Sequence, residues 1–221
     1  MKFISSEFGQ ALQLLVMEEV RPLVPVYPTD FWNAIAERNR CASRPSNVLE
    51  SLKSGAKFEV GYAIIQGQHI SITELGVYND GLIVNTRHTD EADAVMSDFI
   101  AWAITEFGFR EPETHIPRRF SSNVIVEFDD TLDLAIKGFS TLNRLADDLT
   151  TAYGQGVRFH VGRISFGVDP ATAIAGVNAP IFIEPRANRP LSEHRYFCGG
   201  PLTTAGLVAW LRTFEGAFLA S

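Results

Sequence analysis

The clearest pattern of apolar positions in the sequence lies between residues 89 and 107. Thr89-Asp90 is typical of a helix start, and Gly108 is typical of a helix stop. Between them the apolar residues recur at the three- and four-residue spacing of one helix face: Ala92, Val95, Met96, Phe99, Ile100, Ala103, Ile104 and Phe107. The pattern therefore predicts an amphipathic helix.

Two runs before this helix have the character of strands. "KFEVGYAIIQ" (57–66) and "HISITELGVY" (69–78) are rich in β-branched residues and partly alternate between apolar and polar positions. After them, Asn79-Asp80-Gly81 lies between apolar flanks, which predicts a hairpin whose turn residues have positive φ.

The N-terminal region gives weaker patterns. Residues 5–20 predict a helix, with Phe8, Leu12, Leu15 and Val16 near one face. Residues 12–16 also fit a strand, because short apolar runs are ambiguous.

A proline-rich stretch and two helices are expected next. "RPLVPVYP" (21–28) contains three prolines, so it is expected to be extended and to lie outside any sheet. Thr29-Asp30 predicts the start of a helix, and Ser46 or Asn47 is expected to cap a shorter one that runs to Lys53.

The C-terminal region again alternates between strands and helices. The expected elements are a strand at 122–128, a helix at 131–153, strands at 157–168 and 180–184, a further strand after a turn, and a last helix at 203–219. The first of these helices is expected to bury one stripe: Leu132, Ile136, Phe139, Leu142, Leu145, Leu149 and Tyr153.

These elements predict an α+β fold with an antiparallel or mixed sheet in two blocks, each covered by amphipathic helices. The polar, proline-containing stretch 111–121 is the expected linker or boundary between an N-terminal region (1–110) and a C-terminal region (122–221). A single compact domain is the alternative. "AWAITEFG" (101–108) and "AWLRTFEG" (209–216) share four residues in register, which raises the hypothesis of an internal duplication.

Composition and net charge exclude some classes of function. The 221 residues are 46% hydrophobic with a net charge of −7, so the chain is globular and repels nucleic acid and anionic membranes. The apolar run near residue 15 is far shorter than the roughly 20 residues of a membrane span and has no leader-like flanks. The sequence therefore predicts a cytoplasmic protein without membrane attachment, and Cys41 and Cys198 are expected to be reduced.

The stretch "VIVEFDDTLD" (124–133) resembles the first motif of the haloacid-dehalogenase-type phosphatases, Asp-x-Asp-x-Thr-Leu after a strand. Glu127 stands where that family has its nucleophilic aspartate, and the family's later basic and acidic residues have no counterpart. We interpret the stretch as a helix start, in which Asp129 or Asp130 is the cap and Asp133 lies in the first turn.

The remaining catalytic candidates are weak. Cys198 precedes two glycines whose amides could form an oxyanion pocket, but on a strand His194 would lie about 13 Å away. A base such as His160 would have to come from elsewhere. The five histidines have no metal-ligand spacing, and "YGQGVRF" (153–159) follows a helix rather than a strand, so neither a metal nor a cofactor is predicted.

Arginine usage is unusual, with 15 arginines and 4 lysines. Arg186, Arg189 and Arg195 crowd one late segment and are the candidate binding residues, because arginine forks suit carboxylates and protein interfaces. The sequence favours a non-catalytic protein-protein interaction or assembly component (an adaptor, structural or immunity-type protein) that binds another protein or itself as a homo-oligomer. The alternative is an enzyme with a dispersed active site and Cys198 as its nucleophile.

Overall fold

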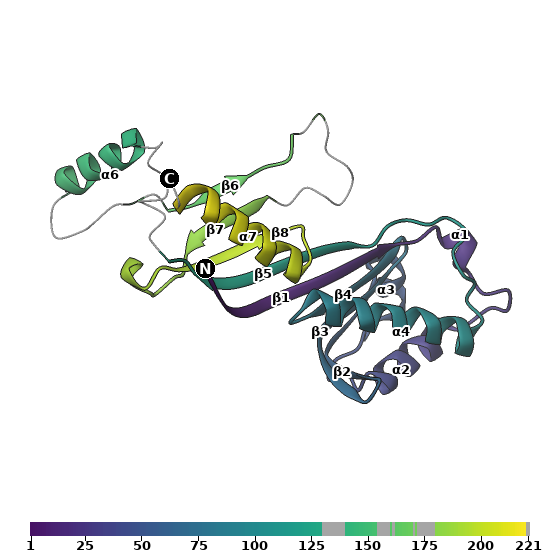
Figure 1. Ribbon diagram of the computed structural model, residues 1–221. Helices are drawn as coiled ribbons and strands as arrows, with labels where there is room; N and C mark the ends of the chain where they lie inside the picture. The colour runs from purple at the N-terminus through teal and green to yellow at the C-terminus, as the bar shows by residue number, and fades with distance from the viewer. Residues whose placement is uncertain (130–139, 154–159, 161, 170, 172–179, 220–221) are drawn as a thin grey trace. The chain divides into compact units, whose positions relative to one another are not determined.

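The computed structural model describes residues 1–129, 140–153, 160, 162–169, 171 and 180–219 (Figure 1). It confirms an α+β fold, in which helices accompany an eight-stranded antiparallel sheet with strand order β2-β3-β4-β1-β5-β8-β7-β6.

The strands are β1 (Lys2–Leu14), β2 (Ala56–Ile65), β3 (Gln68–Tyr78), β4 (Gly81–Thr86), β5 (Arg119–Glu127), β6 (Ile164–Phe166), β7 (Ile181–Pro185) and β8 (Arg195–Gly200). The described helices are α1 (Met17–Val20), α2 (Pro28–Arg38), α3 (Val48–Ser54), α4 (Thr89–Phe107), α6 (Ser140–Tyr153) and α7 (Thr204–Leu219), with a short 3-10 turn η2 (Leu191–Glu193).

The chain divides into two compact units. Unit 1 consists of Met1–Ser6 and Asn123–Ser221, and unit 2 consists of Glu7–Ser122. Strands β1 and β5 each contribute residues to both units. The stretch 111–121 lies in unit 2.

The two halves of the chain have the same order of elements. In the first half, β1 is followed by helices α1 to α3, by the strands β2, β3 and β4, and then by α4. In the second half, β5 is followed by α6, by β6, β7 and β8, and then by α7. The strand orders β2-β3-β4-β1 and β6-β7-β8-β5 also correspond. This order supports the hypothesis of an internal duplication.

The core of unit 2 forms between its sheet and helices α2 and α4 (Figure 1). Strand β3 buries Ile70 and Ile72 two positions apart, as a strand with one covered face should, and it also buries Leu75 three positions further on. Helix α4 buries the predicted stripe at Ala92, Val95, Met96, Phe99 and Ala103 and ends at Gly108, which has a φ of 67°. The helix predicted at 90–107 is confirmed.

Unit 1 has its own core, in which α7 packs against β5, β7 and β8. Val124 and Val126 of β5 and Phe128 just after it contribute to this core, and Leu207 and Leu211 supply the contribution of α7. The last helix and strand 122–128 are therefore confirmed within one or two residues, apart from an earlier start of β5 at Arg119.

The helix expected at 5–20 is wrong over most of its length, because residues 2–14 form β1. The inward positions of this strand are Ser6, Gly9 and Ala11, which carry almost no apolar signal. A Cβ at Gly9 would lie 2.4 Å from the backbone of His88 and Thr89, so the start of α4 requires glycine there. Because the buried positions of β1 are small or polar, the sequence shows no alternation of apolar residues there.

The hairpin predicted at Asn79-Asp80 is confirmed, since Tyr78 and Gly81 pair across it. Its turn type was wrong: neither Asn79 nor Asp80 has positive φ. The turn with two positive φ values joins β2 to β3 at Gln66 (51°) and Gly67 (80°).

The structure tests two other predictions only in part. Residues 130–139 and most of 157–163 lie outside the described residues, so the cap at Asp130 and the strand start at 157 are not tested. Within α6, Leu145 and Leu149 are 50% and 54% exposed, so the buried stripe predicted there is wrong at these two positions. Helical spacing marks an apolar face but does not say that the same molecule covers it.

The Gln66-Gly67 turn gives a test of backbone strain alone. Gly67→Ala is expected to lower the free energy of unfolding by about 1 kcal/mol, because alanine is strained at positive φ. No other atom lies within 4 Å of the added Cβ, so packing does not contribute. Gln66→Asn should instead raise stability slightly, since asparagine tolerates this conformation. Chemical denaturation measures both, and an unchanged Gly67→Ala variant would contradict the turn assignment.

Candidate functional site

An aromatic cluster around Phe31 joins the helices of unit 2. The Phe31 ring lies 4.9 Å from that of Phe107, 5.1 Å from Phe109, 6.0 Å from Trp102 and 6.3 Å from Phe99, measured between centroids. Such contacts add to the energy of burial and fix ring orientation. The cluster holds α2, α4 and the start of the following segment together.

A small pocket opens beside this cluster; the free space in and around it, open solvent included, is about 520 Å³. Its lining is almost wholly apolar and comes from Leu15 after β1, from α1, α2, the β3–β4 hairpin, α4 and the segment after α4. The lining residues are Leu15, Met17, Val20, Phe31, Val77, Tyr78, Gly81, Leu82, Phe99, Ile100, Ala103, Ile104, Phe109, Arg110 and Pro112. Apolar concave sites of this kind commonly bind ligands or partner side chains.

A second, wider hollow of about 1050 Å³ adjoins the pocket and shares five lining residues with it: Met17, Phe31, Val77, Tyr78 and Phe109. It runs along the proline-rich segment 21–28 and reaches Trp32 of α2 and Leu52 of α3. We call the pocket and this hollow together the unit 2 groove.

Exposed apolar side chains flank the groove. Leu23, Val24 and Tyr27 are 85%, 75% and 77% exposed, and Leu52 is 44% exposed. Pro22, Pro25 and Pro28 line the groove from the same segment and restrict its backbone. A cluster of large exposed apolar residues beside an apolar hollow is typical of an interaction surface.

The segment after α4, which forms one wall of the groove, is held by hydrogen bonds. Arg110 donates from its backbone to the carbonyl of Val20 (3.0 Å) and from Nε to that of Arg21 (2.9 Å). Thr114 donates from its backbone nitrogen and its hydroxyl to the Glu19 carboxylate at 2.8 and 2.5 Å. These bonds, the hydroxyl's first, lower the pKa of Glu19.

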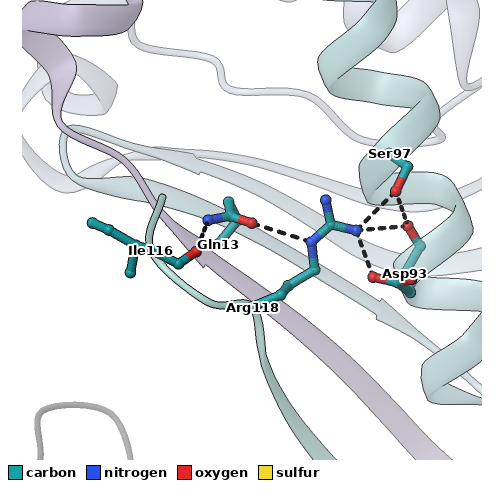
Figure 2. Close-up of polar contacts among 5 residues, drawn as sticks. All are labelled: Gln13, Asp93, Ser97, Ile116 and Arg118. Carbon is teal, nitrogen blue, oxygen red and sulfur yellow. Dashed lines mark hydrogen bonds and ion pairs between the residues drawn. The ribbon is translucent and has the colours of Figure 1, made fainter. Parts of the chain in front are cut away.

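The side chain of Arg118 holds the C-terminal end of this segment by hydrogen bonds. Figure 2 shows its guanidinium between Gln13 on one side and Asp93 and Ser97 on the other. Nη1 donates to the Asp93 carboxylate (2.5 Å) and to the Ser97 hydroxyl (2.8 Å), and Nε donates to Gln13 (3.2 Å). The Gln13 amide donates in turn to the carbonyl of Ile116 at 2.8 Å. The wall is therefore tied to β1 and α4 before any partner binds.

The groove carries little charge. Arg110 and Arg21 are the charged residues among the described residues that line it. The Arg110 guanidinium donates to the backbone carbonyls of Arg21 and Glu18, so these contacts leave its formal charge without a carboxylate partner. Glu19 lies close enough for Arg110 to lower its pKa.

The structure places Cys198 in the core of unit 1. Its side chain is 0% exposed, and its strand position pairs with Ile183 of β7. Burial, with a smaller effect of Glu184, raises the pKa of its thiol far above the usual value. A thiol with a raised pKa is a poor nucleophile at neutral pH.

The other candidate residues are distributed as follows. Arg189 and Arg195 both reach Glu193, at 3.6 and 3.7 Å, and Arg195 also reaches Glu127 at 3.5 Å. The hypothesis that these arginines bind a partner remains a prediction, but their charges already meet carboxylates of unit 1.

Arg186, His194 and His160 complete the candidate set. The backbone amide of Arg186 donates a hydrogen bond to the carbonyl of Arg195. His194 has a φ of 50°, and its carbonyl accepts the Phe128 amide at 3.0 Å, so its described role is to shape the turn before β8. His160 is exposed. Among the described residues, no group of His, Cys, Asp and Glu could hold a metal ion.

The residues of the phosphatase-like stretch have structural partners. Glu127 accepts from Arg195, and the Asp129 amide donates to the Glu215 carboxylate at 2.9 Å. Whether Asp129 or Asp130 caps a helix is not tested, because the following residues lie outside the described part of the chain.

Sequence reasoning missed the unit 2 groove. The available signal was the combination of Leu23, Val24 and Tyr27 with three prolines in segment 21–28, an apolar stretch that cannot enter a sheet. The rest of the lining comes from six other parts of the chain, and their meeting requires the tertiary fold.

No protein-family model matches the chain, and no curated protein matches it in sequence. Among the described helices, none combines the length and the apolar character needed to cross a membrane. The groove is therefore interpreted from its own residues.

The Arg118 contacts predict a local effect. Arg118→Met keeps the apolar stem but removes the guanidinium, and it should lower the free energy of unfolding by about 1–2 kcal/mol. Amide hydrogen exchange should become faster in residues 109–118, because the wall loses its anchor. Arg21→Met is the control, since Arg21 is exposed and should change stability by less than about 0.5 kcal/mol. Equal exchange in both variants would contradict the anchoring role.

Burial of Cys198 predicts slow alkylation. Because the raised pKa leaves little thiolate at neutral pH, iodoacetamide should label Cys198 at least about 10-fold more slowly than a model thiol. Labelling in denaturant should remove the difference. Peptide mass spectrometry measures both rates, and fast labelling of the folded protein would revive the enzyme hypothesis.

Proposed function

We propose that this chain is a non-catalytic protein-protein interaction or assembly component, and that the unit 2 groove is its binding surface. The observation that carries the proposal is the apolar groove with Leu23, Val24, Tyr27 and Leu52 exposed beside it. An isolated chain has no energetic reason to display this much apolar side chain, and burial against a partner removes it from water.

The rigidity of the groove supports the same proposal. Its floor is the Phe31 aromatic cluster, and its walls are the proline-restricted segment 21–28 and the hydrogen-bonded segment 109–118. A surface that is ordered before binding loses less conformational entropy on association. We expect the partner to contribute an apolar anchor to the pocket and a polar rim around it.

The remaining parts of the proposal follow from the sequence. We propose a cytoplasmic location, and a fold of two sheet blocks that each have a helical cover. Adaptor, structural and immunity-type roles all remain within this proposal. Nucleic acid is a poor candidate partner for a chain with a net charge of −7.

The test compares a groove variant with a matched control. Leu52→Gln removes an exposed apolar side chain that lines the groove, and Leu23→Gln removes one from segment 21–28 beside it; the pair should leave thermal stability nearly unchanged. Ile64→Gln is the control, because Ile64 is exposed on β2 and belongs neither to the groove lining nor to segment 21–28.

The readout is quantitative capture of proteins from a native lysate, followed by affinity measurement on the captured partner. The groove variant should bind the partner about 10-fold or more weakly, whereas the control should bind like the wild type. If no captured protein and no self-association depend on the groove residues, the proposal is wrong.

A further inference from the structure

Helix α6 of unit 1 carries an apolar stripe that its own unit leaves exposed. Leu145 and Leu149 are one helical turn apart and about half exposed. Helix α2 of the first half, by contrast, buries Phe31, Trp32, Ile35 and Ala36. Among the described residues, α6 thus presents exposed leucines on one face, and unit 2 presents an open apolar groove.

The two surfaces are complementary in charge. Asp148 lies three residues from Leu145 and one from Leu149, so it flanks the stripe, and Asp147 precedes it. With Arg144, the described part of α6 carries one net negative charge. The charged residues lining the groove are Arg21 and Arg110.

The two surfaces also match in form. A helix of 14 residues is about 21 Å long and presents its apolar residues as a ridge. The groove is a hollow that continues from the apolar pocket along segment 21–28. Insertion of an amphipathic helix into such a groove, with residues at i and i+4 as anchors, is a common mode of recognition.

We infer that the unit 2 groove binds helix α6 of a second copy of this chain. The inference rests on the proposed function of the groove and names its occupant. Leu145 and Leu149 enter the apolar part of the groove, and Asp148 faces Arg21. This contact is heterologous: each copy offers one helix and one groove, so copies join into a ring or into an open chain.

The first measurement is the mass of the protein in solution. The weight-average mass from multi-angle light scattering should rise above the chain mass of 24.4 kDa as the concentration increases from about 1 to about 200 µM. The α6 variant, Leu145→Gln with Leu149→Gln, should remain monomeric over this range. The groove variant, Leu23→Gln with Leu52→Gln, should do the same.

Mixing the two variants tests the heterologous geometry. The α6 variant keeps an intact groove, and the groove variant keeps an intact α6. An equimolar mixture should therefore form a one-to-one dimer that does not grow further. An isologous contact between two α6 helices, or between two grooves, would give no such dimer and would overturn the inference.

A charge exchange tests the assigned pair. Asp148→Arg should weaken self-association about 10-fold or more, and Arg21→Glu should weaken it similarly. The double variant should recover a large part of the loss, which a merely structural effect of either change would not produce. Failure of the double variant to recover would overturn this placement of α6.

The outcomes separate this inference from the proposed function. A protein that stays at 24.4 kDa at every concentration, and whose groove variant still loses a captured partner, overturns the α6 inference and leaves the proposed function in place. Loss of neither self-association nor capture in the groove variant overturns both.

Discussion

The packing of Phe31 against four aromatic rings is the interaction on which the rest of unit 2 depends. These rings come from α4 and from the segment after it, so one side chain of α2 fixes three parts of the chain. Phe31 also lines both parts of the groove. The same contact that closes the core therefore forms the floor of the candidate binding surface.

Polar contacts of arginine side chains stabilise unit 2 in addition to the aromatic cluster. Arg38 lies over Trp102 and pairs with Asp98 at 2.6 Å, which closes the solvent side of the cluster. Arg110 and Arg118 both lie in the segment after α4; Arg110 donates to the carbonyls of Glu18 and Arg21, and Arg118 donates to Asp93 and Ser97 of α4. The arginine-rich composition thus has a partly structural explanation, because a planar fork can satisfy several acceptors where an ammonium cannot.

The two halves of the chain use one topology with different helical cover. In the first half, α2 buries large apolar residues against its unit, whereas the described leucines of α6 face solvent. A repeated order of elements therefore does not imply a repeated surface. The chain thus offers both an exposed apolar helix face and a groove, which are the two surfaces that the proposed heterologous contact requires.

The sequence could predict elements whose own residues carry a strong signal. Helix α4 followed from its apolar spacing and its terminal glycine, and Asn47 caps α3 by accepting the Glu50 amide at 3.3 Å, as proposed. Strand β1 could not be recognised, because its buried positions are Ser6, Gly9 and Ala11, and at Gly9 the close approach of the start of α4 excludes a side chain. The positive-φ turn was assigned to the wrong loop, since Asn-Asp-Gly is the stronger local signal but Gln66-Gly67 occupies that conformation.

For the candidate site, too, the sequence determined local properties, and the tertiary structure determined which residues meet. The sequence by itself determined that the chain is α+β, that segment 21–28 stays outside the sheet, and which faces of the helices are apolar, because these properties follow from local spacing and from proline. Only the tertiary structure decided that Cys198 is buried, that Arg189 and Arg195 meet carboxylates, and that segments from residue 15 to residue 112 line one groove. Burial and pairing depend on residues far apart in the chain, and no local pattern records which distant segments will meet.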